Sequence, residues 1–154
     1  MRQISYNMKN QEIWITGHKL ISHDSSGDFD IAVLESPVGV PGPPPHLHTS
    51  YTEMFLVLEG EMEFIVDGKK TQLGPGDSID LKVNTTHTFK NVGDSACKFV
   101  NIHSPKGFSA FFKDMGISAD EEKAQERSTS KEQINKLIEN AERYDMHIQM
   151  AKLD

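Results

Sequence analysis

The chain lacks the features that mark secreted, membrane-spanning and nucleic-acid-binding proteins. Its 154 residues include a single cysteine, Cys97, so no disulfide can form within the chain and the cysteine content gives no sign of secretion. No apolar run approaches the roughly eighteen residues of a transmembrane helix, and residues 1–7 lack the apolar core of a signal peptide. The net charge is −7 and no basic residues cluster, which argues against nucleic acid as a partner. We therefore expect a soluble, cytoplasmic protein with no membrane partner.

The chain up to Pro105 has the pattern of an antiparallel β-sheet. Short runs rich in valine, isoleucine, phenylalanine and threonine are separated by glycine and proline turns, and Asp67 followed by Gly68 is a strong hairpin signal. We expect strands at residues 13–16, 19–23, 29–35, 53–58, 62–66, 70–73, 78–81, 86–91 and 97–103. Many short strands at this spacing, in a chain long enough for one domain with a buried core, predict a sandwich or a small barrel.

After Pro105 the apolar residues recur at helical spacing. A first amphipathic helix, which Gly116 would end, is predicted from Phe108, Phe111, Phe112 and Met115. Capping-box spacing predicts two more helices, one starting at Ser118 with Glu121 and one at Ser130 with Gln133. The last of these has an apolar stripe made of Ile134, Leu137, Ile138, Ala141 and Tyr144. We divide the chain into a β-barrel over residues 1–105 and a helical extension, packed on the barrel, over residues 106–154.

The phenylalanines of the first predicted helix have two possible places. They could close a pocket as a lid over the barrel mouth. An apolar helical stripe more often packs on the outside of a sheet, and we favour that arrangement.

Four polar side chains form the strongest functional pattern in the chain. They are His46, His48, Glu53 and His87. On an extended segment His46 and His48 project from the same side, and Glu53 follows just before an apolar run. Three imidazoles and a carboxylate that converge on one point suit one divalent transition metal, whether Fe, Mn, Co, Ni, Cu or Zn. The alternative is that these side chains only satisfy hydrogen bonds in a polar barrel mouth.

Other residues are candidates for a substrate pocket beside this metal site. An apolar wall is predicted from Phe55, Met62, Phe64 and Phe89, although such residues are more often plain barrel core. Tyr51 is a candidate for the rim. His103 shares a strand face with Phe99 and Asn101. That face could line the cavity, although we favour an ordinary structural role for this histidine. The remaining histidines, interpreted as ordinary surface or structural residues, are His18, His23 and His147.

Strand alternation also predicts an apolar outer face. If Glu53 faces inward, the opposite face of its strand carries Met54, Leu56 and Leu58, which is too apolar to leave in water. The C-terminal helices, a second subunit, or both must cover it. On this ground we predict a homodimer.

The four polar residues resemble the first motif of the cupin superfamily, the small double-stranded β-helix (jelly-roll) barrels. That motif has a glycine, then His-x-His, three or four residues, a glutamate, six residues and a glycine. Here His46, His48, Glu53 and Gly60 match it, whereas Val40 stands where the leading glycine is usual.

A second cupin motif follows in order. It has a proline-glycine turn, a histidine and, four positions on, an asparagine, and the chain matches it with Pro75, Gly76, His87 and Asn91. A proline that usually precedes the histidine is missing, with Val83 and Asn84 in its place.

The resemblance covers residues 29–103 and implies a mainly β, cupin-type jelly-roll barrel with a C-terminal α-helical extension. The segments on either side of the barrel, residues 42–48 and 104–108, look most like small single-domain cupins related to quercetin dioxygenases. That likeness implies a metal-dependent dioxygenase acting on a small enol or phenol, with the substrate hydroxyl bound at the metal and Glu53 as the catalytic base.

Two other functions remain open at this point. The same ligands could serve a metal-dependent isomerase, epimerase or lyase that uses no oxygen. The barrel could also be a non-catalytic module that binds or senses a small molecule. A fold does not determine a function, so the cupin resemblance does not decide among the three.

Overall fold

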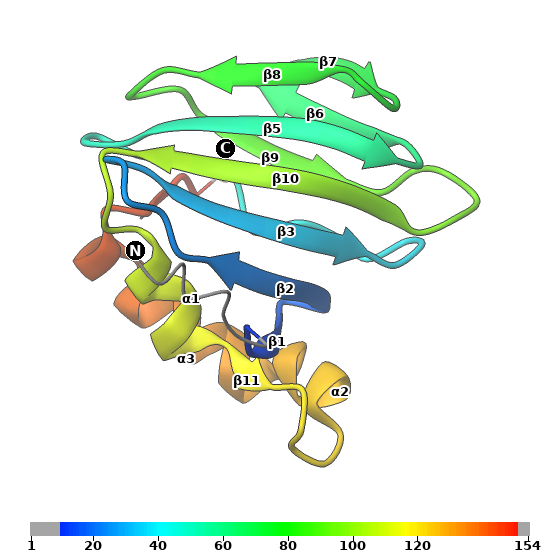
Figure 1. Cartoon of the computed structure of the whole chain (residues 1–154), viewed down its shortest axis with the longest axis vertical. Coiled ribbons are helices and arrows are strands. Elements are labelled where there is room, and N and C mark those ends of the chain that lie inside the picture. The colour runs from blue at the N-terminus through cyan, green and yellow to red at the C-terminus, as the bar shows by residue number, and fades with distance from the viewer. Residues whose placement is uncertain (1–9, 151–154) are drawn as a thin grey trace, which may run out of the picture.

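Two antiparallel β-sheets form the body of the molecule (Figure 1). The computed structural model describes residues 10–150, so the expectation about a signal peptide at residues 1–7 lies outside the described residues. The larger sheet has the order β11-β1-β2-β3-β10-β5-β8. Its strands are β1 (Glu12–Ile15), β2 (His18–His23), β3 (Asp30–Ser36), β5 (Thr52–Glu59), β8 (Ser78–Leu81), β10 (Cys97–Ser104) and β11 (Ile117–Ser118).

The smaller sheet has the order β12-β4-β9-β6-β7. Its strands are β4 (His46–Leu47), β6 (Met62–Val66), β7 (Lys69–Leu73), β9 (His87–Lys90) and β12 (His147–Ile148). The predicted mainly β fold is confirmed, and each of the nine expected runs corresponds to a strand. The sequence missed β4, β11 and β12, because strands of two residues are too short to show a periodicity.

Strand alternation and register decide what faces the space between the sheets. In β10 every second residue is buried, which turns Phe99, Asn101 and His103 inward. The antiparallel pairing of β10 with β5 then sets His103 directly opposite Glu53. A large hydrophobic residue, Phe55, lies next to this pair and opposite Asn101. A polar group of side chains therefore borders the aromatic core.

Three helices follow the last long strand: α1 (Ser109–Met115), α2 (Ala124–Ser128) and α3 (Lys131–Asn140), with a 3₁₀ turn η1 (Ala141–Tyr144) after α3. As predicted, α1 ends at Gly116 and α3 begins at Ser130, whose hydroxyl accepts a hydrogen bond from Gln133 N. The predicted capping box at Ser118 is wrong. Glu121 N donates to the backbone oxygen of Ser118, so the chain makes a turn there and α2 begins only at Ala124.

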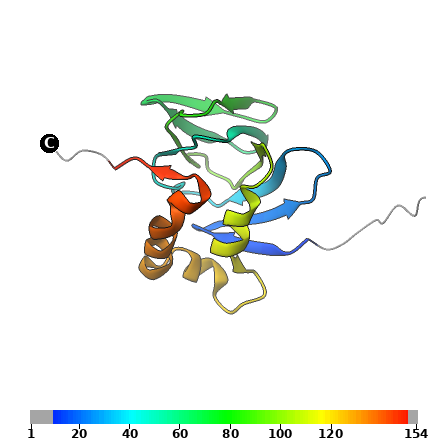
Figure 2. The same cartoon turned by 90° about the vertical axis from the view of Figure 1, so that its left-hand side faces the viewer.

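The helices group beside β1 and β2, at one end of the two sheets (Figures 1 and 2). The favoured arrangement, with the helical stripe on the outside of a sheet, is wrong. Phe108, Phe111 and Phe112 are buried and join the same hydrophobic core as the barrel residues. The physical reason is that the rings leave water by joining the aromatic core, where Phe108 also stacks on His103 with ring centroids 4.1 Å apart. No helix among residues 10–150 is long and apolar enough to cross a membrane.

Candidate metal centre

His46, His48, Glu53 and His87 meet at one point between the two sheets. His46 on β4 pairs directly with His87 on β9, and their ring centroids are 4.4 Å apart. His48 follows β4, and Glu53 reaches across from β5 in the other sheet. One ligand atom from each side chain lies within 4.8 Å of all the others, and all four residues are buried. The fold thus assembles the group that the sequence pattern singled out.

The outer nitrogen of each of the three imidazoles has a backbone partner. The Nδ1 atoms donate to carbonyl oxygens, His46 to Pro44 at 2.9 Å, His48 to Asp145 at 2.8 Å and His87 to Thr85 at 3.0 Å. A carbonyl oxygen only accepts, so each Nδ1 carries the proton of the neutral ring. The Nε2 atoms are left with a lone pair directed at the cluster, which is the tautomer that metal-binding histidines adopt.

When all three rings are neutral, the inward-facing atoms of the cluster are therefore all electron-rich. Glu53 Oε2 lies 2.8 Å from His87 Nε2 and 3.2 Å from His48 Nε2, yet all three buried atoms lack a hydrogen-bond partner. Buried polar atoms without partners are rare and costly, and lone pairs that face one another repel. A divalent cation would satisfy them together. The imidazole and carboxylate donors suit a transition metal, so the residues present fit such an ion.

Charge and burial set the protonation states of these groups. Burial, reinforced by the neighbouring His87, lowers the pKa of His46 to about 3. Burial alone would raise the pKa of Glu53, but the adjacent imidazoles, His103 foremost, hold it well below its usual range. Burial lowers the pKa of His87, but the neighbouring Glu53 carboxylate raises it by more, so the net shift of this pKa is upward. At neutral pH Glu53 is ionised, and a metal competes with a proton for His87.

The second carboxylate oxygen of Glu53 is held from behind. Asn101 Nδ2 donates to Oε1 at 2.9 Å, and His103 Nε2 lies 3.2 Å from the same oxygen without hydrogen-bond alignment. His103 stacks on Phe108 with ring centroids 4.1 Å apart. These contacts turn Oε2 toward the three ligand histidines. His103 therefore adjoins Glu53 from β10 and is separate from the four-residue cluster.

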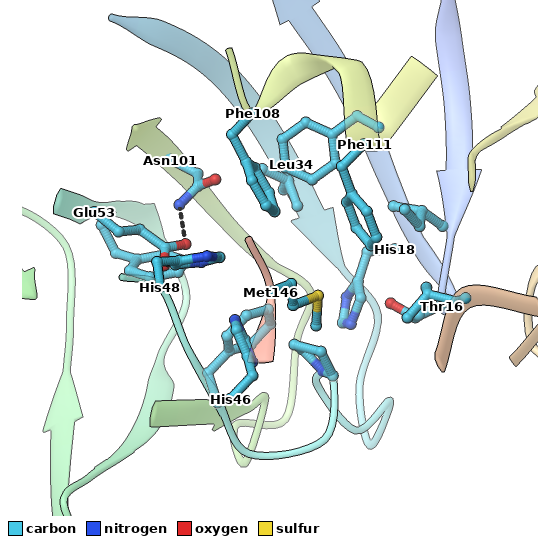
Figure 3. A pocket seen from close by; sticks show the side chains of 16 residues that line it. Thr16, His18, Leu34, His46, His48, Glu53, Asn101, Phe108, Phe111 and Met146 are labelled. Atoms are coloured by element: carbon cyan, nitrogen blue, oxygen red, sulfur yellow. Dashed lines mark hydrogen bonds and ion pairs between the residues drawn. The ribbon is translucent and has the colours of Figure 1, made fainter. Parts of the chain in front are cut away.

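A cavity of about 60 Å³ adjoins the cluster (Figure 3). Phe55 and Phe89, which were expected to line a pocket, form part of its wall. Met62 and Phe64 are completely buried in the core and do not line it. Tyr51 is half-buried beside His48 and Phe108 and is also absent from the wall.

The helical extension also lines the cavity. It contributes Phe108, Phe111 and Phe112, which the sequence offered as a possible lid, and Leu137 and Met146, which were not expected. His18, which was taken for a surface or structural residue, is 1% exposed and also lines the cavity. The alternation of β2, which buries His18 and Leu20 on one face, is the signal that could have placed it. His23 and His147 do not line the cavity.

Known proteins resemble this chain in sequence and in structure. A model of the cupin domain matches residues 32–103. The quercetin 2,3-dioxygenase of Bacillus subtilis (strain 168) is 32% identical over 101 residues, which are 64% of this chain and 29% of that protein. KdgF from Halomonas sp. superposes with a TM-score of 0.55 at 21% identity, covering 61% of this chain and 85% of the other. A cupin-superfamily sugar phosphate isomerase from Silicibacter pomeroyi gives a TM-score of 0.53 at 19% identity, covering 57% and 59%.

These similarities support conclusions of different strength. The two solved structures share too little sequence with this chain to indicate more than a common fold. The chain spans less than a third of the length of the curated relatives it matches. The match over residues 32–103 contains all four clustered residues, whereas the helical extension lies outside it.

Proposed function

We propose that this chain, which belongs to the cupin superfamily as its two motifs predicted, is a metal-dependent dioxygenase. Its substrate would be a small enol or phenol. One observation carries the proposal. His48 and Glu53 each have an unpartnered buried atom in the cluster that fits a transition metal, and both residues line an apolar, aromatic-walled cavity. The similarity to the quercetin 2,3-dioxygenase supports the choice of reaction. We keep the cytoplasmic location as a prediction.

In the proposed reaction, the metal ligands and Glu53 would have different chemical roles. A divalent metal held by His46, His48, His87 and Glu53 would supply Lewis acidity toward a substrate hydroxyl and the redox chemistry that dioxygen requires. Glu53 is ionised at rest; Asn101 holds its Oε1, and its Oε2 lies beside His48 Nε2 and His87 Nε2 in the cluster. Oε2 is thus the atom placed to receive the proton of that hydroxyl.

The cavity wall would exclude water and hold a planar substrate. Phe55, Phe89 and Phe108 line the cavity, and the rings of Phe55 and Phe89 are neighbours with centroids 5.5 Å apart. Aromatic walls favour a flat ring or enol system through stacking and edge contacts. A low-polarity pocket also strengthens the interaction between a substrate oxyanion and the groups around it.

The nature of the wall disfavours a charged substrate such as a sugar phosphate, but not every non-oxidative reaction. A sugar phosphate would need cationic groups for its phosphate, and none of the described residues that line the cavity is lysine or arginine. An isomerase, epimerase or lyase acting on an uncharged enol would still suit the site, because Glu53 could move a proton without oxygen. A binding or sensing role would need the same pocket but no turnover.

The first test is elemental analysis of protein made without an affinity tag, beside a His46→Ala/His87→Ala double variant. We expect near-stoichiometric Fe, Mn, Co, Ni or Cu in the native protein and its loss from the double variant. Oxygen uptake with a panel of enols and phenols then tests the reaction. Zinc without oxygen uptake would favour non-oxidative chemistry. Protein that holds no metal, even after reconstitution, would rule out the metalloenzyme and leave a ligand-binding barrel.

A further inference from the structure

The cavity has a second polar end besides the metal-ligand cluster. His18 is the first residue of β2; it is 1% exposed and lines the same cavity. Figure 3 shows its imidazole across the cavity from Glu53 and His48, with Met146 between them. Its ring centroid is 5.5 Å from that of Phe89, another wall residue. His18 is not a member of the four-residue cluster.

The protonation of His18 follows from its one hydrogen bond. His18 Nε2 lies 3.1 Å from the carbonyl oxygen of Pro41. Since a carbonyl oxygen only accepts, Nε2 must carry a proton; the other tautomer would set two acceptors against each other. Burial lowers the pKa of His18 to about 4, so at neutral pH the ring carries this proton alone. Nδ1 is consequently a bare acceptor.

This acceptor is unsatisfied in the described structure. His18 Nδ1 is buried and has no hydrogen-bond partner. The cavity wall around it is largely apolar, with Leu34, Phe111 and Met146 among its members. A buried acceptor left unpaired destabilises a protein and needs an explanation. In a largely apolar pocket, a small number of polar groups usually fixes the orientation of the ligand.

We propose that His18 Nδ1 accepts a hydrogen bond from a second polar group of the substrate, at the end remote from the metal-ligand cluster. This inference rests on the proposed function and narrows its substrate class. The substrate is then a small aromatic or enolic compound with two polar ends. One hydroxyl meets the cluster beside Glu53, an O–H or N–H donor reaches His18, and the body between them is apolar. A methyl group in place of the donor would leave Nδ1 unpaired, so the site discriminates against that analogue.

Pairs of simple phenols test the inference: resorcinol against 3-methylphenol, and hydroquinone against 4-methylphenol. Binding is measured by calorimetry on the zinc-loaded protein without dioxygen. In the native protein we expect at least one dihydroxy compound to bind about tenfold more tightly than its methyl partner. His18→Phe removes the acceptor and should abolish the preference. His18→Gln can donate to Pro41 and still present a carbonyl oxygen, so it should retain most of it.

Three results would overturn the inference. They are no preference in either pair for the native protein, an unchanged preference in His18→Phe, or failure of all four phenols to bind. A ligand-independent check is the nitrogen-15 spectrum of His18 in the zinc-loaded native protein. We expect a protonated Nε2 and a bare Nδ1, and a protonated Nδ1 would contradict the inference even if no variant folds.

The proposed function fails in a different way. A protein that loads metal and prefers the dihydroxy compounds, but consumes no oxygen with any of them, would refute the dioxygenase and leave the role of His18 standing. Conversely, oxygen uptake with phenols would support the dioxygenase. If the native protein showed no preference for the dihydroxy compounds, or if His18→Phe left that preference unchanged, the same data would refute the role of His18.

Discussion

At the scale of single residues, the orientation of Glu53 depends on a neighbour that binds no metal itself. Asn101 Nδ2 holds Glu53 Oε1 at 2.9 Å and leaves Oε2 to the cluster. Asn101→Leu removes that donor, so Glu53 can rotate away. We expect metal affinity to fall by about 10- to 100-fold, the usual effect of losing a hydrogen bond to a metal ligand. Chelator competition measures it, with the exposed Asn135→Leu as the control. Equal affinity in Asn101→Leu would mean that Glu53 is oriented by other contacts.

Protonation of His87 sets the pH dependence of metal loading. The pKa of His87 is raised above 6.5, and a metal must displace the proton from Nε2. Metal affinity should therefore weaken as pH falls through and below this raised pKa, and level off above it. Titrations of metal affinity between about pH 5 and pH 8 measure the dependence. The stability of the metal-free protein should change with pH in the opposite direction. Protonated His87 stabilises the fold fully below pH 6.5, and this contribution to the free energy of unfolding is lost as pH rises through the raised pKa.

Neutral His18 makes the fold sensitive to acid. Its pKa is lowered from 6.5 to about 4, so between these values the unfolded chain takes up a proton that the folded chain does not. The free energy of unfolding should fall as pH drops through this interval, by on the order of 3 kcal/mol for this residue. Denaturant unfolding at pH 7 and pH 4.5 measures it. A smaller acid loss in His18→Phe supports this account, and an equal loss contradicts it.

At the scale of elements, Asp145 in the turn after η1 forms hydrogen bonds with the segment His48–Ser50 and holds it in place. The Asp145 carboxylate accepts hydrogen bonds from Thr49 N at 3.0 Å and Ser50 N at 2.7 Å, and the backbone oxygen of Asp145 accepts from His48 Nδ1 at 2.8 Å. Asp145→Ala releases this loop and should weaken metal binding without abolishing it, whereas Asp145→Asn should lose less. Asp114→Ala is the matched control, since Asp114 bonds Tyr144 and none of the four clustered residues. Equal metal affinity in all three variants would exclude this role.

Deletion of residues 130–154 tests how the extension and the barrel depend on each other. It removes Leu137 and Met146, both buried in the shared core, together with Asp145. Exposure of the apolar surface beneath them should cost cooperative unfolding and solubility. Thermal unfolding followed by circular dichroism measures the loss. Retained folding with altered substrate affinity would instead identify the segment as a lid.

At the scale of the whole molecule, an apolar sheet face bears on the predicted homodimer. Leu56, Val100, Val33 and Ile21 are cross-strand neighbours on β5, β10, β3 and β2, and each is half-buried. Among residues 10–150, helix α2 packs against β1 and β11, and the main helix–strand contacts do not involve β2, β3, β5 or β10. Val100→Lys should give a monomer by light scattering if a second copy covers the face, since a buried charge opposes association. Thr71→Lys, exposed on β7, is the control. A monomeric native protein would refute the dimer.

The sequence alone determined most of the strands and the composition of the candidate metal centre. Strand alternation is a local property, so the inward faces of β5 and β10 could be read from residues such as Glu53, Phe55 and Asn101. The helix start at Ser130 was likewise local, because its capping bond spans three positions. The four ligand-type side chains were recognised by type and spacing. Only β4, β11 and β12 escaped, because their pairing partners define them rather than any periodicity.

Tertiary structure alone decided what surrounds that centre. Asp145 supports His48 from 97 positions away, and His18 shares a cavity with Glu53 only because β2 and β5 lie in one curved sheet. The helical spacing of Phe108, Phe111 and Phe112 predicted an apolar stripe. It did not predict the surface against which that stripe packs. Such contacts depend on how distant segments pack against one another, and a short stretch of sequence carries the period of a side chain but not the identity of its partner.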